Sequence, residues 1–218
     1  MVRVRSSRPI VAALALLLTL LAVGLLPNRA AAAPSTFSNS APIGIPLFGS
    51  ATSYPATVSA SGLSGGITAL TVTLYGLDFN RPDDVDILLV GPTGAGLVIF
   101  SDVGGTTSVN NLTITLNDAA GSLLPDATTL ASGTFKPTNM TTGGADLFPA
   151  PAPGSFASAT PTGSATFASV FNGTAPNGIW SLYIVDDDDN GSASALVSGW
   201  PRRTPPPTAS PRSPSPPR

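Results

Sequence analysis

The sequence predicts an all-β domain, a sandwich or jelly roll without disulfides. Short β-branched and apolar runs are separated by glycine, proline, serine and threonine, a pattern typical of strands and turns. No long stretch beyond residue 33 has apolar residues at helical spacing. The 218 residues contain no cysteine, so the fold is held together without disulfides. Several short strands at this spacing favour an antiparallel sandwich over a parallel α/β sheet.

The first candidate strands lie between residues 43 and 100. Three of them are β-branched or partly alternating segments, at 43–45, 54–59 and 67–75. Residues 84–90 and 97–100 flank the turn signal Gly91-Pro92-Thr93-Gly94. These last two segments are therefore predicted to pair as a hairpin.

The later candidates are residues 111–116, 179–185 and 195–197. The first of them alternates cleanly and places Leu112, Ile114 and Leu116 on one face. In the second, Trp180 alternates with the apolar residues that follow, so its side chain is expected to point into the core. Residues 137–165 are rich in proline, glycine, threonine and alanine, and they predict a long surface loop.

The first 33 residues are typical of a secretory signal peptide. Three arginines precede an apolar run over residues 10–26, and a small-residue site follows, with cleavage expected after Ala32. The predicted organisation is a signal peptide at 1–32, a β-sandwich at 33–200 and a disordered tail at 201–218, so the mature protein is expected to be extracellular. The tail holds eight prolines and four arginines and cannot bury enough surface to fold. An uncleaved membrane anchor is the alternative, because the apolar run approaches the roughly 20 residues of a span. After cleavage no membrane association is expected.

The charge of the predicted domain excludes several classes of function. Between Ala33 and Trp200 lie twelve aspartates, no glutamate, and only Arg81 and Lys136 as cations, which gives 2 − 12 = −10. Such a domain repels nucleic acid and attracts divalent cations. The sequence has no histidine or cysteine, so it offers neither a Cys/His zinc site nor a Ser-His-Asp triad. We therefore expect no enzyme, with a carboxylate hydrolase as the one remaining catalytic class.

A first candidate calcium site is the run from Asp186 to Gly191. Asp186, Asp188 and Asn190 fit the D-x-D-x-N-G spacing, in which alternate oxygens point inward and the glycine permits a sharp turn. Loop position twelve is Val197 rather than the bidentate glutamate of an EF-hand. The pattern therefore predicts a partial Ca²⁺ loop between two strands, with a solvated acidic turn as the alternative.

A second candidate site contains Asp84 and Asp86. They lie two residues apart on a predicted strand and so share a face. Asp83 is adjacent, and the predicted hairpin brings Asp102 near them. Calcium binding is one interpretation of this group, and protection of an edge strand by charge is the other.

Four stretches, taken in order, resemble a known family. They are 72–77 with 81–94, an acidic stretch at 117–120, Phe171-Asn172-Gly173 continuing through Gly178-Ile179-Trp180 to Asp186, and Gly191 through Gly199-Trp200. This ordered set is similar to the P domain (P/Homo B domain) of subtilisin-like proprotein convertases, in a bacterial-type stand-alone version. The resemblance implies a jelly-roll β-sandwich of the galactose-binding-like kind. It also implies a non-catalytic module that packs against a subtilisin-like protease domain and supports its folding and calcium dependence.

Two positions depart from the family pattern. Phe79 stands where the family often has a histidine, and Pro201 begins the tail where the family continues with a final strand. We expect this last strand to be missing through truncation or a reading-frame change near Trp200. The alternative function is a jelly-roll module that binds carbohydrate or an extracellular surface polymer. The aromatic residues that could stack on sugars are Trp180, Trp200, Tyr54, Tyr75 and Tyr183. On strands, such residues more often belong to the core.

Overall fold

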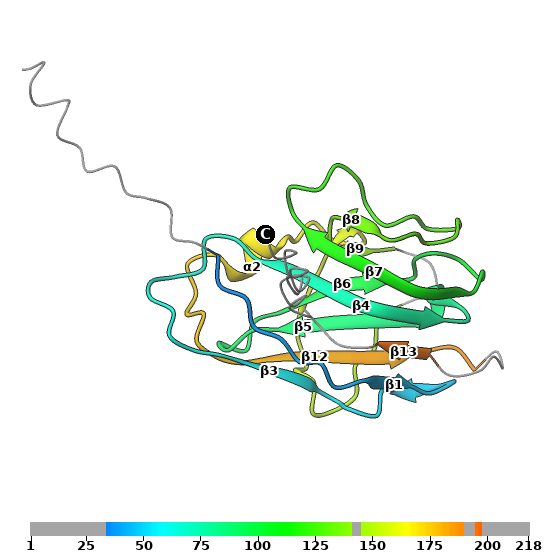
Figure 1. Ribbon diagram of the computed structural model, residues 1–218, viewed down its shortest axis with the longest axis horizontal. Coiled ribbons are helices and arrows are strands. Elements are labelled where there is room, and N and C mark those ends of the chain that lie inside the picture. The colour runs from blue at the N-terminus through cyan, green and yellow to red at the C-terminus, as the bar shows by residue number, and fades with distance from the viewer. Residues whose placement is uncertain (1–33, 141–144, 190–194, 198–218) are drawn as a thin grey trace, which may run out of the picture. The chain divides into compact units, whose positions relative to one another are not determined.

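Two β-sheets face each other across one apolar core (Figure 1). The computed structural model describes residues 34–140, 145–189 and the backbone of 195–197. The smaller sheet has five strands in the order β1-β13-β4-β7-β8. Its strands are β1 (Ile43–Ile45), β13 (Ala195–Val197), β4 (Thr71–Phe79), β7 (Val109–Asn117) and β8 (Gly133–Phe135). The predicted all-β class is confirmed.

The larger sheet has eight strands and carries the candidate site. Its order is β11-β9-β6-β5-β12-β2, with β10 beside β6 and β3 beside β12. Its strands are β2 (Gly49–Ser50), β3 (Ala56–Ala60), β5 (Val85–Val90), β6 (Gly96–Ser101), β9 (Thr138–Asn139), β10 (Ala157–Ser158), β11 (Thr160–Pro161) and β12 (Gly178–Asp186). The short helices η1 (Pro82–Asp84) and α2 (Phe167–Phe171) complete the described elements.

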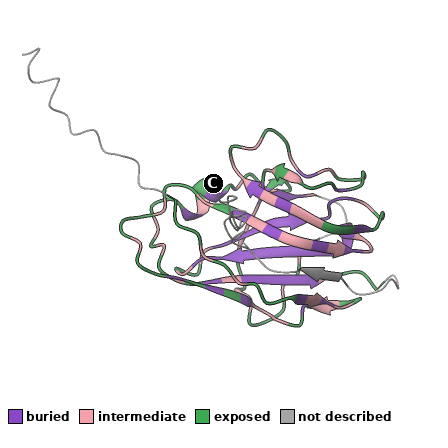
Figure 2. Ribbon diagram, in the orientation of Figure 1, coloured by how far each residue is buried: buried purple, intermediate pink, exposed green. Residues whose placement is uncertain are grey.

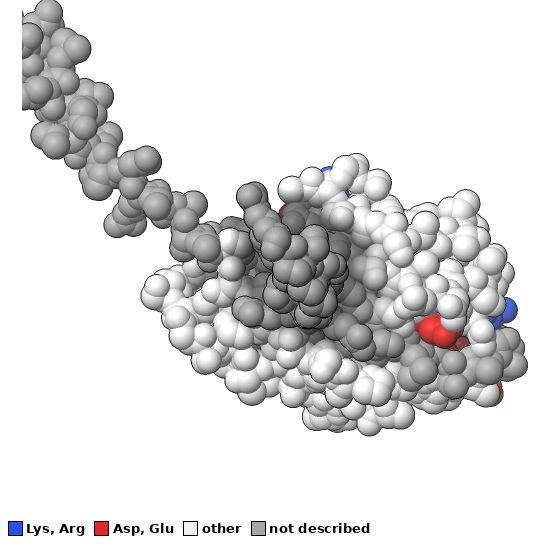
Figure 3. Space-filling view, in the orientation of Figure 1, with Lys and Arg blue, Asp and Glu red and all other residues white. Residues whose placement is uncertain are grey.

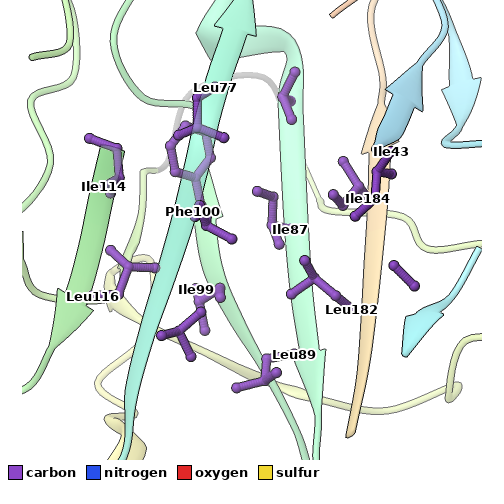
Figure 4. Close-up of a cluster of buried hydrophobic side chains, with 14 of the residues drawn as sticks. Ile43, Leu77, Ile87, Leu89, Ile99, Phe100, Ile114, Leu116, Leu182 and Ile184 are labelled. Carbon is purple, nitrogen blue, oxygen red and sulfur yellow. The ribbon is translucent and has the colours of Figure 1, made fainter. Parts of the chain in front are cut away.

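The core lies between the two sheets and follows the alternation of their strands. In β4 the residues facing inward are buried while their neighbours are partly exposed. Leu77 and Ile114 of the smaller sheet lie across from Ile87 and Leu182 of the larger one (Figure 4). β5 and β6 are buried along their whole length, because both faces of the larger sheet are covered there (Figure 2).

Residues from two of the stretches that carry the family resemblance pack at one place in this core. The rings of Phe171 and Trp180 are 5.3 Å apart. A Cβ atom on Gly91 would lie 3.1 Å from the Phe171 ring and 3.4 Å from Trp180. Trp180 is 7 % exposed, which confirms that its side chain points inward. The glycine is therefore required by the close approach of two aromatic rings.

The structure corrects two sequence-based predictions. The strand predicted from residue 67 begins only at Thr71, because the backbone of Ile67 bonds instead to the loop after α2, through Gly173 and Thr174. The loop predicted over 137–165 is not simply a surface loop. Its Asn139 is fully buried in β9, which pairs in parallel with β6. Two-residue strands of polar residues carry no apolar alternation, so periodicity cannot find them.

Several predictions fall outside the described residues. They concern the signal peptide at 1–32, Asn190, Trp200 and the tail at 201–218. Among the residues that are described, none belongs to a helix long and apolar enough to cross a membrane.

Candidate metal centre

Strand direction brings acidic residues together at one end of the larger sheet. β5 is antiparallel to both β6 and β12, so the start of β5 lies beside the ends of its two neighbours. Asp86 opposes Val185 near the end of β12, and Asp102 directly follows β6. Parallel pairing places Asn139 of β9 opposite Ser101 of β6. The start of β5, the end of β6 and β9 therefore contribute polar side chains to one place.

Three carboxylates form the centre of this group. One oxygen each of Asp86, Asp102 and Asp146 lies within 4.8 Å of the other two. Oxygens on opposite sides of one Ca²⁺ are about 4.6–5.2 Å apart, since each lies 2.3–2.6 Å from the ion. Asp86 is only 2 % exposed and Asp102 is 8 % exposed, so bulk water solvates neither group well. The spacing and burial fit a single bound cation.

The hydrogen bonds within the group leave oxygens unsatisfied. The Ser101 hydroxyl lies 2.9 Å from Asp146 Oδ1 and 3.2 Å from Asp102 Oδ2, but it has one proton to donate. Asn139 Nδ2 donates to Asp146 Oδ2 at 2.6 Å. Asp86 Oδ2 and Asn139 Oδ1 are buried with no hydrogen-bond partner. Buried acceptors without donors are costly, so these two oxygens call for a cation or an ordered water.

The electrostatics of the group indicate the same requirement. Burial raises the pKa of Asp86 to about 8, a hydrogen bond from Ser101 opposes the shift, and the charges of Asp146 and other aspartates add to it. Burial likewise raises the pKa of Asp102 to about 7. Among the described residues, no lysine or arginine forms an ion pair with the three carboxylates, and Arg81 pairs with Asp84 instead. Without a compensating cation, the group therefore cannot hold three negative charges near neutral pH.

The backbone at Asp102 fits this geometry. Its φ of 53° lies in the left-handed region, which aspartate and asparagine adopt more readily than other residues with a side chain. The turn at the end of β6 thus places a carboxylate beside Ser101 rather than continuing the strand. Sequence reasoning placed Asp102 near Asp86 through the hairpin, and the structure confirms this proximity.

The other predicted ligands are not members of the group of three carboxylates, or they lie outside the described chain. Asp84 ends η1 rather than sharing a strand face with Asp86, and Arg81 Nε donates to its carboxylate at 3.0 Å. Asp186 is the last residue of β12. Burial and the charge of Asp84 raise its pKa to about 7. Asp188 is exposed. The predicted loop site stays a prediction, because Asn190 is not described.

Sequence reasoning missed Asp146, Asn139 and Ser101. The first two lie in the segment predicted as a surface loop, and Asp146 is 60 positions from Asp86 along the chain. No local spacing links these residues. The parallel pairing of β9 with β6 brings Asn139 beside Ser101, and both side chains then bond to Asp146. One signal in the sequence was that Asp146 is the single charged residue of the segment 137–165.

The ligand atoms that this centre offers are carboxylate oxygens, with the Ser101 hydroxyl oxygen beside them. Such a set suits a hard cation such as Ca²⁺ rather than zinc, which prefers nitrogen and sulfur. The face shown in Figure 3 is mostly uncharged, and most of the acidic atoms visible on it gather toward the end where β12 terminates.

Of the aromatic residues considered for sugar binding, two are buried, and Tyr54 and Tyr75 are half-buried. Trp180 and Tyr183 are each 7 % exposed. Tyr54 meets Tyr183 edge to face, with ring centroids 5.0 Å apart. Trp200 lies outside the described residues.

Searches with protein-family models, among curated proteins and among solved structures found no match to this chain.

Proposed function

We propose that this chain is a secreted, non-catalytic β-sandwich module that binds Ca²⁺ through Asp86, Asp102 and Asp146. The observation that carries this proposal is the convergence of three carboxylates, in which Asp86 Oδ2 is buried without a donor, beside the buried and equally unpartnered Asn139 Oδ1. A divalent cation bound there offsets the repulsion of the carboxylates and supplies the missing partner.

Calcium suits this centre better than magnesium. Ca²⁺ accepts six to eight oxygens in flexible geometry, while Mg²⁺ demands a tight octahedron and keeps several waters. Asn139 Oδ1 and Ser101 Oγ can add neutral oxygens to the three charged ones, which fits the larger ion. The module is expected to gain stability from the ion, because the unfolded chain cannot hold these residues together.

We further propose that the fold is a jelly roll of the P-domain kind and that it accompanies a subtilisin-like protease. The packing of Gly91 against Phe171 and Trp180 supports this, because the residues that carry the resemblance have a shared structural role. The lack of histidine and cysteine supports a non-catalytic role. Affinity purification of the secreted protein tests the association. A subtilisin-like protease in the eluate is the expected result, and capture only by cell-surface polymers would favour the alternative role as a surface-binding module.

Direct titration tests the metal site. Isothermal calorimetry of the chelator-treated protein with Ca²⁺ is expected to show binding by the wild type. Binding should be weakened at least tenfold by Asp86→Asn, and it should be unchanged by Asp126→Asn, an exposed aspartate that is not one of the three carboxylates. Equal binding by both variants would place the ion outside this centre and would direct attention to the loop at Asp186.

A further inference from the structure

The larger sheet has a second apolar cluster on its outer face, away from the core between the sheets. Leu88, Val90, Val98 and Tyr183 form it. Residues 146–156, which we call the strap, cover this cluster together with Tyr54. Phe148 and Phe156 of the strap pack on the cluster.

The middle and the downstream end of the strap are held by neutral contacts. The Tyr54 hydroxyl donates to the Pro149 carbonyl at 3.0 Å, and the Tyr183 hydroxyl donates to the Pro151 carbonyl at 3.2 Å. Beyond Phe156 the chain enters β10, which pairs with β6 in the sheet. None of these contacts involves a charged group.

The upstream end is held differently, because it is Asp146. Its carboxylate accepts hydrogen bonds from Ser101 and Asn139, but it also lies within 4.8 Å of the carboxylates of Asp86 and Asp102. Repulsion at this distance pushes the end of the strap away from the sheet unless a cation lies between the groups. Asn139, which donates to Asp146, is outside the three carboxylates, and its fully buried Oδ1 has no partner, which is a second sign that an ion binds there.

We infer that Ca²⁺ fastens the strap to the sheet, so that loss of the ion frees the upstream end and uncovers the apolar outer face. This inference rests on the proposed calcium site and adds that Asp146 couples the site to a movable cover. If Ca²⁺ binds only when the strap is closed, opening becomes rarer by the factor 1 + [Ca²⁺]/Kd. At one hundred times Kd, the strap amides should therefore exchange about one hundredfold more slowly.

Hydrogen exchange followed by mass spectrometry tests this on the full secreted chain. Peptides covering the amides from Leu147 to Phe156 are compared in Ca²⁺ and in chelator at equal ionic strength. Melting temperature is measured in the same samples as an independent report of binding. We expect Ca²⁺ to slow the exchange of the strap amides by a larger factor than it slows the exchange of the β3 amides. β3 serves as the comparison because it lies on the far side of β12 from β5 and β6.

The variant Asp146→Asn tests the two effects assigned to this carboxylate, which are repulsion of the strap in chelator and fastening of the strap in Ca²⁺. The amide removes one charge from the group. Its oxygen can accept from Asn139 Nδ2 as Asp146 Oδ2 does, and its NH2 group can donate to the Ser101 hydroxyl oxygen, which donates to Asp146 Oδ1 in the wild type. In chelator, the strap amides of the variant should therefore exchange more slowly than those of the wild type. Ca²⁺ should no longer change their exchange rate. Asp126→Asn is the matched control and should keep the wild-type difference.

Each outcome is decisive. If Ca²⁺ raises the melting temperature but leaves strap exchange unchanged, the inference is overturned while the calcium site stands. If Asp146→Asn keeps the calcium-dependent protection, Asp146 is not the fastening group and the inference also fails. If neither the melting temperature nor the exchange responds to Ca²⁺, the proposed calcium function itself falls.

Discussion

Replacing Asp102 with asparagine is expected to uncouple the stability of the domain from calcium. The substitution is matched in shape, and asparagine also adopts the left-handed conformation found at this position, where φ is 53°. At a pH above 8, where all three carboxylates are ionised, what changes is one negative charge among three. Two of the three repulsive pairs in the group disappear, and so does one charged ligand for the ion.

The size of the effect follows from the spacing. Two ionised carboxylates 4.8 Å apart repel each other by about 3.5 kcal/mol at an effective dielectric constant of about 20. Proton uptake by Asp86 relieves part of this, so the net gain in chelator is smaller. For the wild type, Ca²⁺ at one hundred times Kd contributes about 2.7 kcal/mol. At roughly 2–4 °C per kcal/mol, the melting temperature in Ca²⁺ should exceed that in chelator by about 5–11 °C.

Differential scanning calorimetry in Ca²⁺, Mg²⁺ and chelator at matched ionic strength measures this gap. Asp102→Asn should melt higher than the wild type in chelator and should lose more than half of the gap. Mg²⁺ should raise the wild-type melting temperature less than Ca²⁺ does. If Asp102→Asn melts lower than the wild type in chelator and keeps the full calcium gap, the electrostatic argument is wrong.

Four further outcomes are expected. Burial raises the pKa of Tyr54 to about 12, so its neutral form stabilises the fold below pH 10, and this stability is lost as the pH rises toward 12. The melting temperature of Tyr54→Phe should therefore depend less on pH over that range than the melting temperature of the wild type. In urea denaturation, Gly104→Ala should lower the free energy of unfolding by at least about 2 kcal/mol more than Gly94→Ala. Both glycines have similar positive φ angles, but only at Gly104 would the added Cβ lie 2.5 Å from Leu130. A fluorophosphonate probe should label no serine, since the sequence has no histidine; labelling at one site would contradict this. N-terminal sequencing of secreted protein should begin at Ala33, and a membrane-bound form retaining residue 1 would contradict cleavage.

The strands of the core could be predicted from the sequence, because burial of one sheet face imposes a period of two. Trp180 followed by Leu182 and Ile184 shows that period, and the structure places all three in the core. The hairpin of β5 and β6 was predictable from the Gly-Pro-Thr-Gly turn between its strands. The parallel strands β9, β10 and β11 were not, since two polar residues have no detectable period.

The candidate site could be predicted only in part, for the same physical reason. Asp86 and Asp102 lie on the two arms of one hairpin, so local pairing places them together. Asp146 reaches them through a segment whose path depends on tertiary contacts of Phe148 and Phe156 with the outer face of the sheet. Asp84 was assigned to the strand, but the preceding Pro82 starts a 3₁₀ turn that directs its carboxylate to Arg81.

The position of β12 has a consequence for how this protein folds. β12 is formed late in the sequence, yet it lies inside the larger sheet, with β5 along one edge and β2 and β3 along the other. Its partners end by Val90, so nearly 90 residues separate them from Gly178. Closing loops of that length before any pairing energy is gained makes folding slow. Until β12 inserts, two unpaired strand edges stay open, and a chain shorter than residue 186 is expected to aggregate rather than fold.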